Sequence, residues 1–192
     1  MKKLLVIVSS TGGPKALQRV VPLLPKNIPC PVLIVQHMPA GFTVSLANRL
    51  NGLSKLEVKE VEDNDIIEDS KVYIAKGGNQ LRITSQGGRH KAVLSDEEGM
   101  YGLRPCADIT IKSLVNSSYD EIVCVIMTGM GRDGTEGTRT LKSKKKVYTI
   151  AQDKESSTVY GMPRVIFEEG LADEVVPLDN ITKAITKIME VH

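Results

Sequence analysis

Residues 4–14 read LLVIVSSTGGP, a run of five apolar residues followed by small polar residues, two glycines and a proline. Five consecutive branched apolar residues are typical of a parallel strand that is covered on both faces. The small residues that follow break the strand, and Pro14 suits the first turn of a helix. This stretch therefore predicts a strand–turn–helix unit, which is the building block of an α/β sheet.

The same alternation continues along the chain. Apolar runs predict further buried strands at 31–35, 122–127 and 147–151. Helical spacing of apolar residues predicts helices near 14–24, 42–50, 107–115, 163–169 and 179–189, the last with Asp179 as its N-cap. Short strands at 72–75, 81–83 and 92–94, separated by glycine pairs, predict an antiparallel hairpin insertion. The predicted fold class is α/β, a doubly wound, mostly parallel, Rossmann-like sheet with that insertion.

Length and composition exclude several classes of protein. The 192 residues are 41% hydrophobic, so we expect residues 1–192 to form a single domain with a sizeable core. A net charge of +2 and the lack of tryptophan argue against nucleic acid as a partner. No apolar run reaches the length of a membrane span or a signal-peptide core, so we expect a cytoplasmic protein without membrane insertion.

The cysteines do not suggest a metal site or a disulfide framework. Cys30, Cys106 and Cys124 stand far apart and form no CxxC pair. Cys124 lies within an apolar run, where we expect a buried, inert thiol. Acidic residues do not cluster with histidine, so we expect no metal.

Polar residues follow three predicted strands, at the edge where open parallel sheets bind ligands. Ser9 and Ser10 follow the first strand, His37 closes the second, and Asp133 lies in the glycine-rich turn 128–134. A serine hydroxyl becomes nucleophilic when an imidazole takes its proton and a carboxylate orients that imidazole. N–H groups of the turn at 11–13 could face a developing oxyanion. A Ser–His–Asp triad is one interpretation among several, and the residues alone do not choose between the two serines.

Other interpretations of these segments stay open. A Ser-Thr-Gly-Gly turn is often a phosphate loop or merely a tight turn, but the dinucleotide, Walker and esterase-elbow patterns are all missing. Asp133 could equally be a turn residue or a helix cap. The lysines at 144–146 predict a solvated face, with a docking patch for an acidic protein as the alternative.

Four motifs occur in an order that resembles the catalytic domain of the CheB family, the chemotaxis receptor protein-glutamate methylesterases. They are SSTGG at 9–13, QHMP at 36–39, MTGMGRDG at 127–134, and AQD at 151–153 with YGMP at 160–163. The resemblance spans nearly the whole chain. It departs at Val8-Ser9, where family members commonly have Gly-Ala. It also departs at Gln80, where they often have a histidine outside the triad, a difference that concerns substrate contact rather than chemistry.

The resemblance implies a cofactor-free serine hydrolase that demethylates glutamyl γ-methyl esters on the cytoplasmic helices of methylated chemoreceptors and releases methanol. It implies Ser10 as the nucleophile, His37 as the general base and acid, and Asp133 as the carboxylate that orients His37. The expected oxyanion and substrate-binding donors are backbone N–H groups of Thr11, Gly12 and Met130.

Several alternatives accompany this hypothesis. Deamidation of receptor glutamine could be the main activity, or the chain could be a non-catalytic module that docks on receptors. Members of the family usually begin with a receiver domain, whereas here the first predicted strand begins at Leu4. We therefore expect either an excised catalytic fragment or a freestanding enzyme, with a separate receiver domain as an alternative partner.

Overall fold

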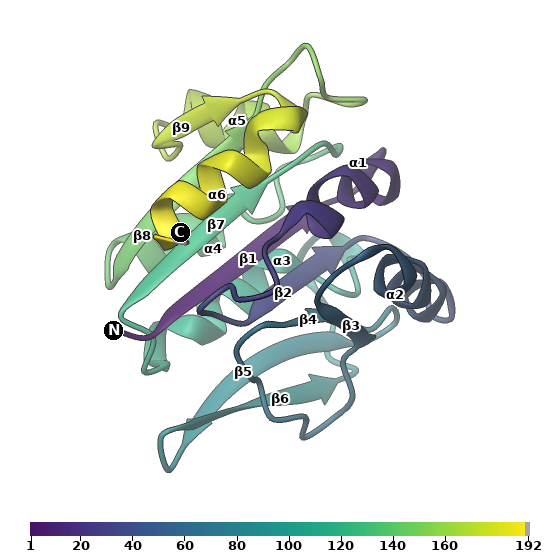
Figure 1. Cartoon of the computed structure of the whole chain (residues 1–192), viewed down its shortest axis with the longest axis vertical. Helices are drawn as coiled ribbons and strands as arrows, with labels where there is room; N and C mark the ends of the chain where they lie inside the picture. Colours follow the sequence, from purple (N-terminus) through teal and green to yellow (C-terminus); the bar gives the residue numbers. More distant parts are fainter. Residues whose placement is uncertain (191–192) are drawn as a thin grey trace.

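The computed structural model describes residues 1–190 and confirms the α/β class (Figure 1). Seven strands form one parallel sheet in the order β3-β4-β2-β1-β7-β8-β9. They are β1 (Lys3–Ser9), β2 (Val32–Gln36), β3 (Glu57–Glu60), β4 (Lys71–Ile74), β7 (Glu121–Ile126), β8 (Lys146–Gln152) and β9 (Glu174–Val176). Strands β5 (Gln80–Gln86) and β6 (Arg89–Ser95) form the separate antiparallel hairpin.

Helices cover both faces of the sheet. One core holds α1 (Gly13–Val20), α2 (Phe42–Leu53) and α6 (Ile181–Met189), and the other holds α3 (Ala107–Ser113), α4 (Thr135–Lys142) and α5 (Met162–Glu168). Figure 1 shows α6 in front of the sheet and α3 and α4 behind it. Residues of β1 alternate between the cores: Leu5 and Ile7 join the first, and Val6 joins the second. The unbroken apolar run of β1 follows from this burial on both sides.

The order of the strands reverses between β1 and β7. From β1 the chain passes through α1 to β2 on one side, whereas from β7 it passes through α4 to β8 on the other. Folds of this kind bind ligands at the carboxyl edge of the sheet, at such a reversal. There the Ser10 N–H donates to the Thr128 carbonyl at 2.9 Å and so ties the loops after β1 and β7 together.

The expectation for residues 72–75 is wrong. This segment does not belong to the antiparallel hairpin, because β4 pairs in parallel with β2 and β3 inside the main sheet. Val72 and Ile74 enter one core and Tyr73 enters the other, so β4 is covered on both faces. A short apolar run does not reveal which strand it will pair with.

The expectation for Asp179 is also wrong. Asp179 lies in a 3₁₀ turn, Leu178–Asn180, and the N-cap of α6 is Asn180. The Asp179 carboxylate instead forms an ion pair with Arg19 at 2.6 Å. Other 3₁₀ turns are Val21–Leu23, Met100–Gly102 and Leu114–Asn116.

The three cysteines lie in the interior as free thiols. Burial raises the pKa of Cys124 to about 12, so this thiol stays protonated, and Cys30 and Cys106 are buried free thiols as well. Across residues 1–190, no cluster of three or more potential His, Cys, Asp or Glu ligands is placed to hold a metal ion. In the same range, no helix has the length and hydropathy needed to cross a membrane.

Candidate active site

The parallel register brings Ser10 and His37 to the same level of the sheet. Ser9 pairs with Gln36 at the ends of β1 and β2, so Ser10 and His37 are the next residues beyond the carboxyl edge of the two strands. The His37 N–H donates to the Ser9 carbonyl at 3.1 Å, which continues the ladder to this point. Both Ser10 and His37 are partly exposed. The loops that carry them thus lie side by side, while within residues 1–190 no hydrogen bond joins the Ser10 hydroxyl to the His37 ring.

Asp133 reaches the same imidazole from the loop after β7. Its Oδ2 lies 2.7 Å from Nε2 of His37, and the two side chains are only 1% and 10% exposed. Because Nε2 is engaged with the carboxylate, Nδ1 is the ring nitrogen left to accept a proton from a hydroxyl. The structure therefore joins the side chains of His37 and Asp133, and it places the backbone of Ser10 next to both of their loops.

Backbone N–H groups surround the Asp133 carboxylate. Oδ2 accepts from Ala107 at 2.7 Å, and Oδ1 accepts from Asp108 at 2.9 Å and from Gly134 at 3.0 Å. Burial alone would raise the pKa of Asp133, but the bonds from His37 and from these N–H groups outweigh it and hold the pKa below its ordinary value. Asp133 is therefore charged, and its carboxylate both binds His37 and caps the start of α3.

The expected oxyanion donors lie in the loops after β1 and β7. Within residues 1–190, the N–H groups of Thr11, Gly12 and Met130 donate to no backbone acceptor. A Cβ at position 129 would lie 2.7 Å from the Cβ of Ser10, so glycine is what allows this loop to approach Ser10 so closely. The three N–H groups are thus free of backbone acceptors, as donors to a substrate oxygen need to be.

Two buried glutamines hold these loops; both lie in motifs quoted above, but neither was assigned a role there. Gln36 Nε2 donates to the Ser10 carbonyl at 2.9 Å, and its Oε1 accepts from the Ser9 hydroxyl at 2.5 Å. Gln152 Oε1 accepts from the Thr128 N–H at 2.8 Å. The sequence signal for such a residue is a polar side chain at the end of an otherwise apolar strand, as at Gln36 and Gln152. Since Ser9 is fully buried and bonded to Gln36, Ser10 is the accessible hydroxyl of the two.

Asp108 is a second buried carboxyl next to Asp133. Its Oδ1 accepts from the N–H groups of Gly137 at 2.6 Å and Gly134 at 3.1 Å, whereas its Oδ2 has no partner among the described residues. Burial, followed by the nearby charge of Asp133, raises the pKa of Asp108 to about 6. Asp108 therefore links α4 to α3. The contribution of this link to the free energy of unfolding depends on whether the Asp108 carboxyl is ionised.

We expect Asp108→Asn to change how stability depends on pH. The pKa of Asp108 in the folded state lies above its unfolded value of about 4, so the wild-type protein loses stability as pH rises from 4 toward 6. That loss is at most about 3 kcal/mol, and the asparagine variant does not suffer it. Urea unfolding at pH 4 and pH 7.5 should show that the free energy of unfolding of the variant, relative to that of the wild type, is higher at pH 7.5. A difference between the two proteins that is the same at both pH values would contradict this assignment.

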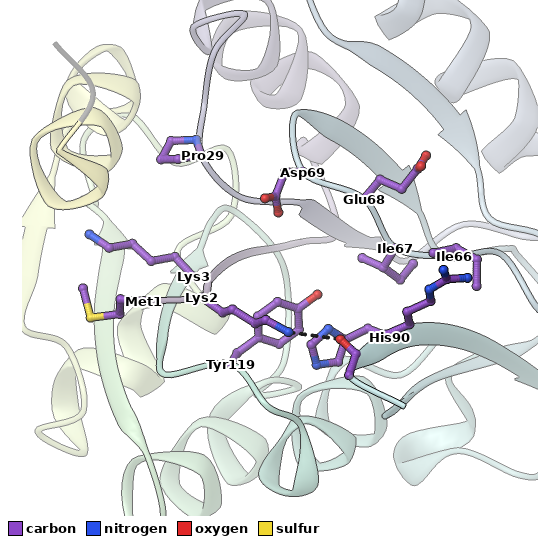
Figure 2. Close-up of a pocket in the computed structure, with 12 residues that line it drawn as sticks. Met1, Lys2, Lys3, Pro29, Ile66, Ile67, Glu68, Asp69, His90 and Tyr119 are labelled. Carbon is purple, nitrogen blue, oxygen red and sulfur yellow. Dashed lines mark hydrogen bonds between the residues drawn. The ribbon is translucent and has the colours of Figure 1, made fainter. Parts of the chain in front are cut away.

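A cavity of about 380 Å³ lies at the opposite, amino end of the sheet (Figure 2). There the His90 ring stacks on Tyr119 with centroids 3.9 Å apart, and Lys2 Nζ donates to the Gly88 carbonyl at 3.0 Å. The Ser118 hydroxyl lies 3.1 Å from His90 Nε2, but the Ser118 N–H already donates to that nitrogen. His90 therefore has a structural role and is not a second base.

Comparisons with known proteins agree with this geometry. The family model described as CheB methylesterase matches residues 5–185. A protein-glutamate methylesterase/protein-glutamine glutaminase of Halalkalibacterium halodurans is 49% identical over 186 residues, which are 97% of this chain and 54% of that protein. A relative of the same name from Geobacillus kaustophilus is 43% identical over 186 residues, which are 97% of this chain and 53% of that protein.

A solved structure matches as well. The crystal structure of the Thermotoga maritima CheB methylesterase catalytic domain has a TM-score of 0.93 and 42% sequence identity, and the match covers 98% of this chain and 99% of that one. This chain spans about half the length of the curated relatives it matches. The chain therefore belongs to the CheB methylesterase family.

Proposed function

We propose that this chain is a serine hydrolase that removes methyl groups from glutamate γ-methyl esters on chemoreceptors and releases methanol. The main support is the pair of His37 and Asp133, joined at 2.7 Å, on loops that adjoin the loop of Ser10 at the reversal of strand order. Family membership and the names of the relatives support the same activity. Residues 1–192 would form the catalytic domain.

The first half of the proposed reaction forms an acyl-enzyme. The Ser10 hydroxyl attacks the ester carbonyl carbon while its proton passes to Nδ1 of His37. Asp133 holds the ring in place and stabilises the imidazolium. N–H groups of Thr11 and Met130 bind the oxyanion, where each such donor is typically worth a factor on the order of 10² to 10³. Collapse of this intermediate, with the proton moving from His37 to the methoxy oxygen, releases methanol.

The second half restores the enzyme. A water molecule gives a proton to His37 and attacks the glutamyl ester on Ser10. The proton then returns to the Ser10 oxygen as the new carboxylate leaves. In net terms, one ester and one water become one carboxylic acid and one methanol.

A second activity uses the same steps. The relatives are named as protein-glutamine glutaminases as well as methylesterases. With a glutamine side chain as substrate, ammonia leaves in place of methanol, and the same glutamyl ester forms on Ser10. We place both reactions in the cytoplasm, on the cytoplasmic helices of receptors, with a separate receiver domain as a candidate partner.

Methanol release tests this proposal directly. The protein is incubated with a chemoreceptor cytoplasmic domain that carries labelled methyl esters, and volatile label is counted. We expect methanol to form in proportion to enzyme. Ammonia without methanol would instead make deamidation the main activity. If neither product forms while the chain still binds the receptor, it is a docking module.

A further inference from the structure

A cavity of about 240 Å³ adjoins the candidate active site. It is lined by His37 with Met38 and Pro39 on one side and by the segment Gly102–Pro105 on the other. A water molecule occupies roughly 30 Å³ in the liquid, and a methyl group is of similar size, so the cavity is several times larger than the group to be removed. It therefore has room for a part of the substrate beyond the scissile ester.

The segment that carries Arg104 along this cavity is held firmly. The fully buried Gln80 donates through Nε2 to the Leu103 carbonyl at 2.7 Å and accepts from the Cys106 N–H at 2.8 Å. The Gly78 N–H donates to the Arg104 carbonyl at 3.2 Å. The buried Gln80 side chain therefore fixes the backbone on both sides of Arg104.

The Arg104 guanidinium has no structural partner. It is exposed, and within residues 1–190 it forms no ion pair and no side-chain hydrogen bond. By contrast, the half-exposed Arg82 pairs with Glu97 at 2.8 Å, and Arg132 pairs with Glu169 at 3.1 Å. Thus a cation on a fixed backbone lies at a cavity that shares His37 with the candidate site, and nothing in the described fold uses its charge.

We propose that Arg104 binds a carboxylate of the substrate helix, one helical turn away from the glutamyl ester that reacts. A guanidinium presents a planar pair of donors that matches a carboxylate. Side chains three or four residues apart lie on the same face of a helix, so an acidic neighbour of the ester can enter the cavity while the ester lies at Ser10. Arg104 would thereby select acidic helices. The inference rests on the proposed function and names a specificity determinant for it.

The test compares two methyl-ester substrates. One is a chemoreceptor cytoplasmic fragment with acidic residues one turn from the ester, and the other is the same fragment with those residues changed to glutamine. We expect Arg104→Ala to lower kcat/KM about 10-fold or more on the acidic fragment, mainly through KM, which is the range for a hydrogen bond to a charged group. On the neutral fragment the change should stay within about 2-fold. Arg104→Lys should recover part of the loss, because it keeps the charge without the paired donors.

Arg89→Ala is the matched control, since Arg89 is also exposed but lies on the hairpin at the amino end of the sheet. It should leave both substrates unaffected. Equal losses on both substrates for Arg104→Ala, or no loss on either, would overturn the inference while leaving the proposed function in place. If the wild-type protein hydrolyses neither fragment, the proposed function itself fails, and this inference fails with it.

Discussion

Replacing Ser10 by alanine should lower kcat by a factor on the order of 10⁴ or more, which is the range seen when a serine hydrolase loses its nucleophile. The fold should survive, because the hydrogen bonds at this turn are made by the Ser10 backbone. Its N–H donates to Thr128, and its carbonyl accepts from Gln36 and Gly13. Single-turnover methanol release measures the first effect, and urea unfolding measures the second. We expect the free energy of unfolding to change by less than about 1 kcal/mol.

Ser9→Ala is the matched control, since it removes the neighbouring hydroxyl. The Ser9 hydroxyl is buried and donates to Gln36 Oε1 at 2.5 Å, so its loss leaves a buried acceptor without a donor. That should cost about 1–3 kcal/mol of stability while turnover continues. If Ser9→Ala abolishes turnover and Ser10→Ala does not, the assignment of the nucleophile is wrong.

Asp133→Asn should impair both catalysis and folding. Removing the charge that orients the imidazole lowers kcat by roughly 10⁴ in other triads, and we expect a loss of that order here. The amide nitrogen would also face N–H donors in either orientation, because Oδ2 accepts from Ala107 and Oδ1 accepts from Asp108 and Gly134. We expect a further loss of about 2 kcal/mol or more in the free energy of unfolding.

The stability deficit of Asp133→Asn should depend on pH. The folded pKa of Asp133 is depressed, so its stabilisation is present above the unfolded value of about 4 and is lost as pH falls through the folded pKa. The free energies of unfolding of the variant and of the wild type should therefore become more similar as the pH falls. Asp65→Asn is the control, because Asp65 accepts from the Glu62 N–H and pairs with Lys59 far from the site. It should lower stability and spare kcat. Wild-type kcat in Asp133→Asn would mean that another group orients His37.

The sheet was largely predictable, because strands covered on both faces leave unbroken apolar runs such as 4–8 and 122–127. Helix α4 was not, because it buries Thr135, Gly137, Thr138 and Leu141 rather than an apolar stripe. Strand β3 reads EVKE and lies at the edge of the sheet, where one exposed side permits charged residues.

The candidate site was predictable as far as its three loops. Their place followed from the rule that ligands bind at the carboxyl edge, to which Ser10, His37 and Asp133 belong. The residues alone did not choose between the serines, and only the family resemblance implied Ser10. The physical difference, the bond that holds the Ser9 hydroxyl on Gln36, is not visible in the local sequence. Asp108 could not be recognised either, because a helical aspartate usually faces water and only the packing of α3 against α4 shows that this one is buried.

Asp133 contacts both His37 and the first turn of α3, and this affects how other members of the family should be interpreted. A chain that had lost its chemistry would still need this carboxylate to hold the first turn of α3, so natural selection for folding alone would retain it. The Ser10 hydroxyl has no such structural duty, since the turn around it is held by backbone atoms and by Gln36. We therefore expect relatives that have kept the fold but lost the reaction to lack the serine at position 10 while retaining the aspartate at position 133.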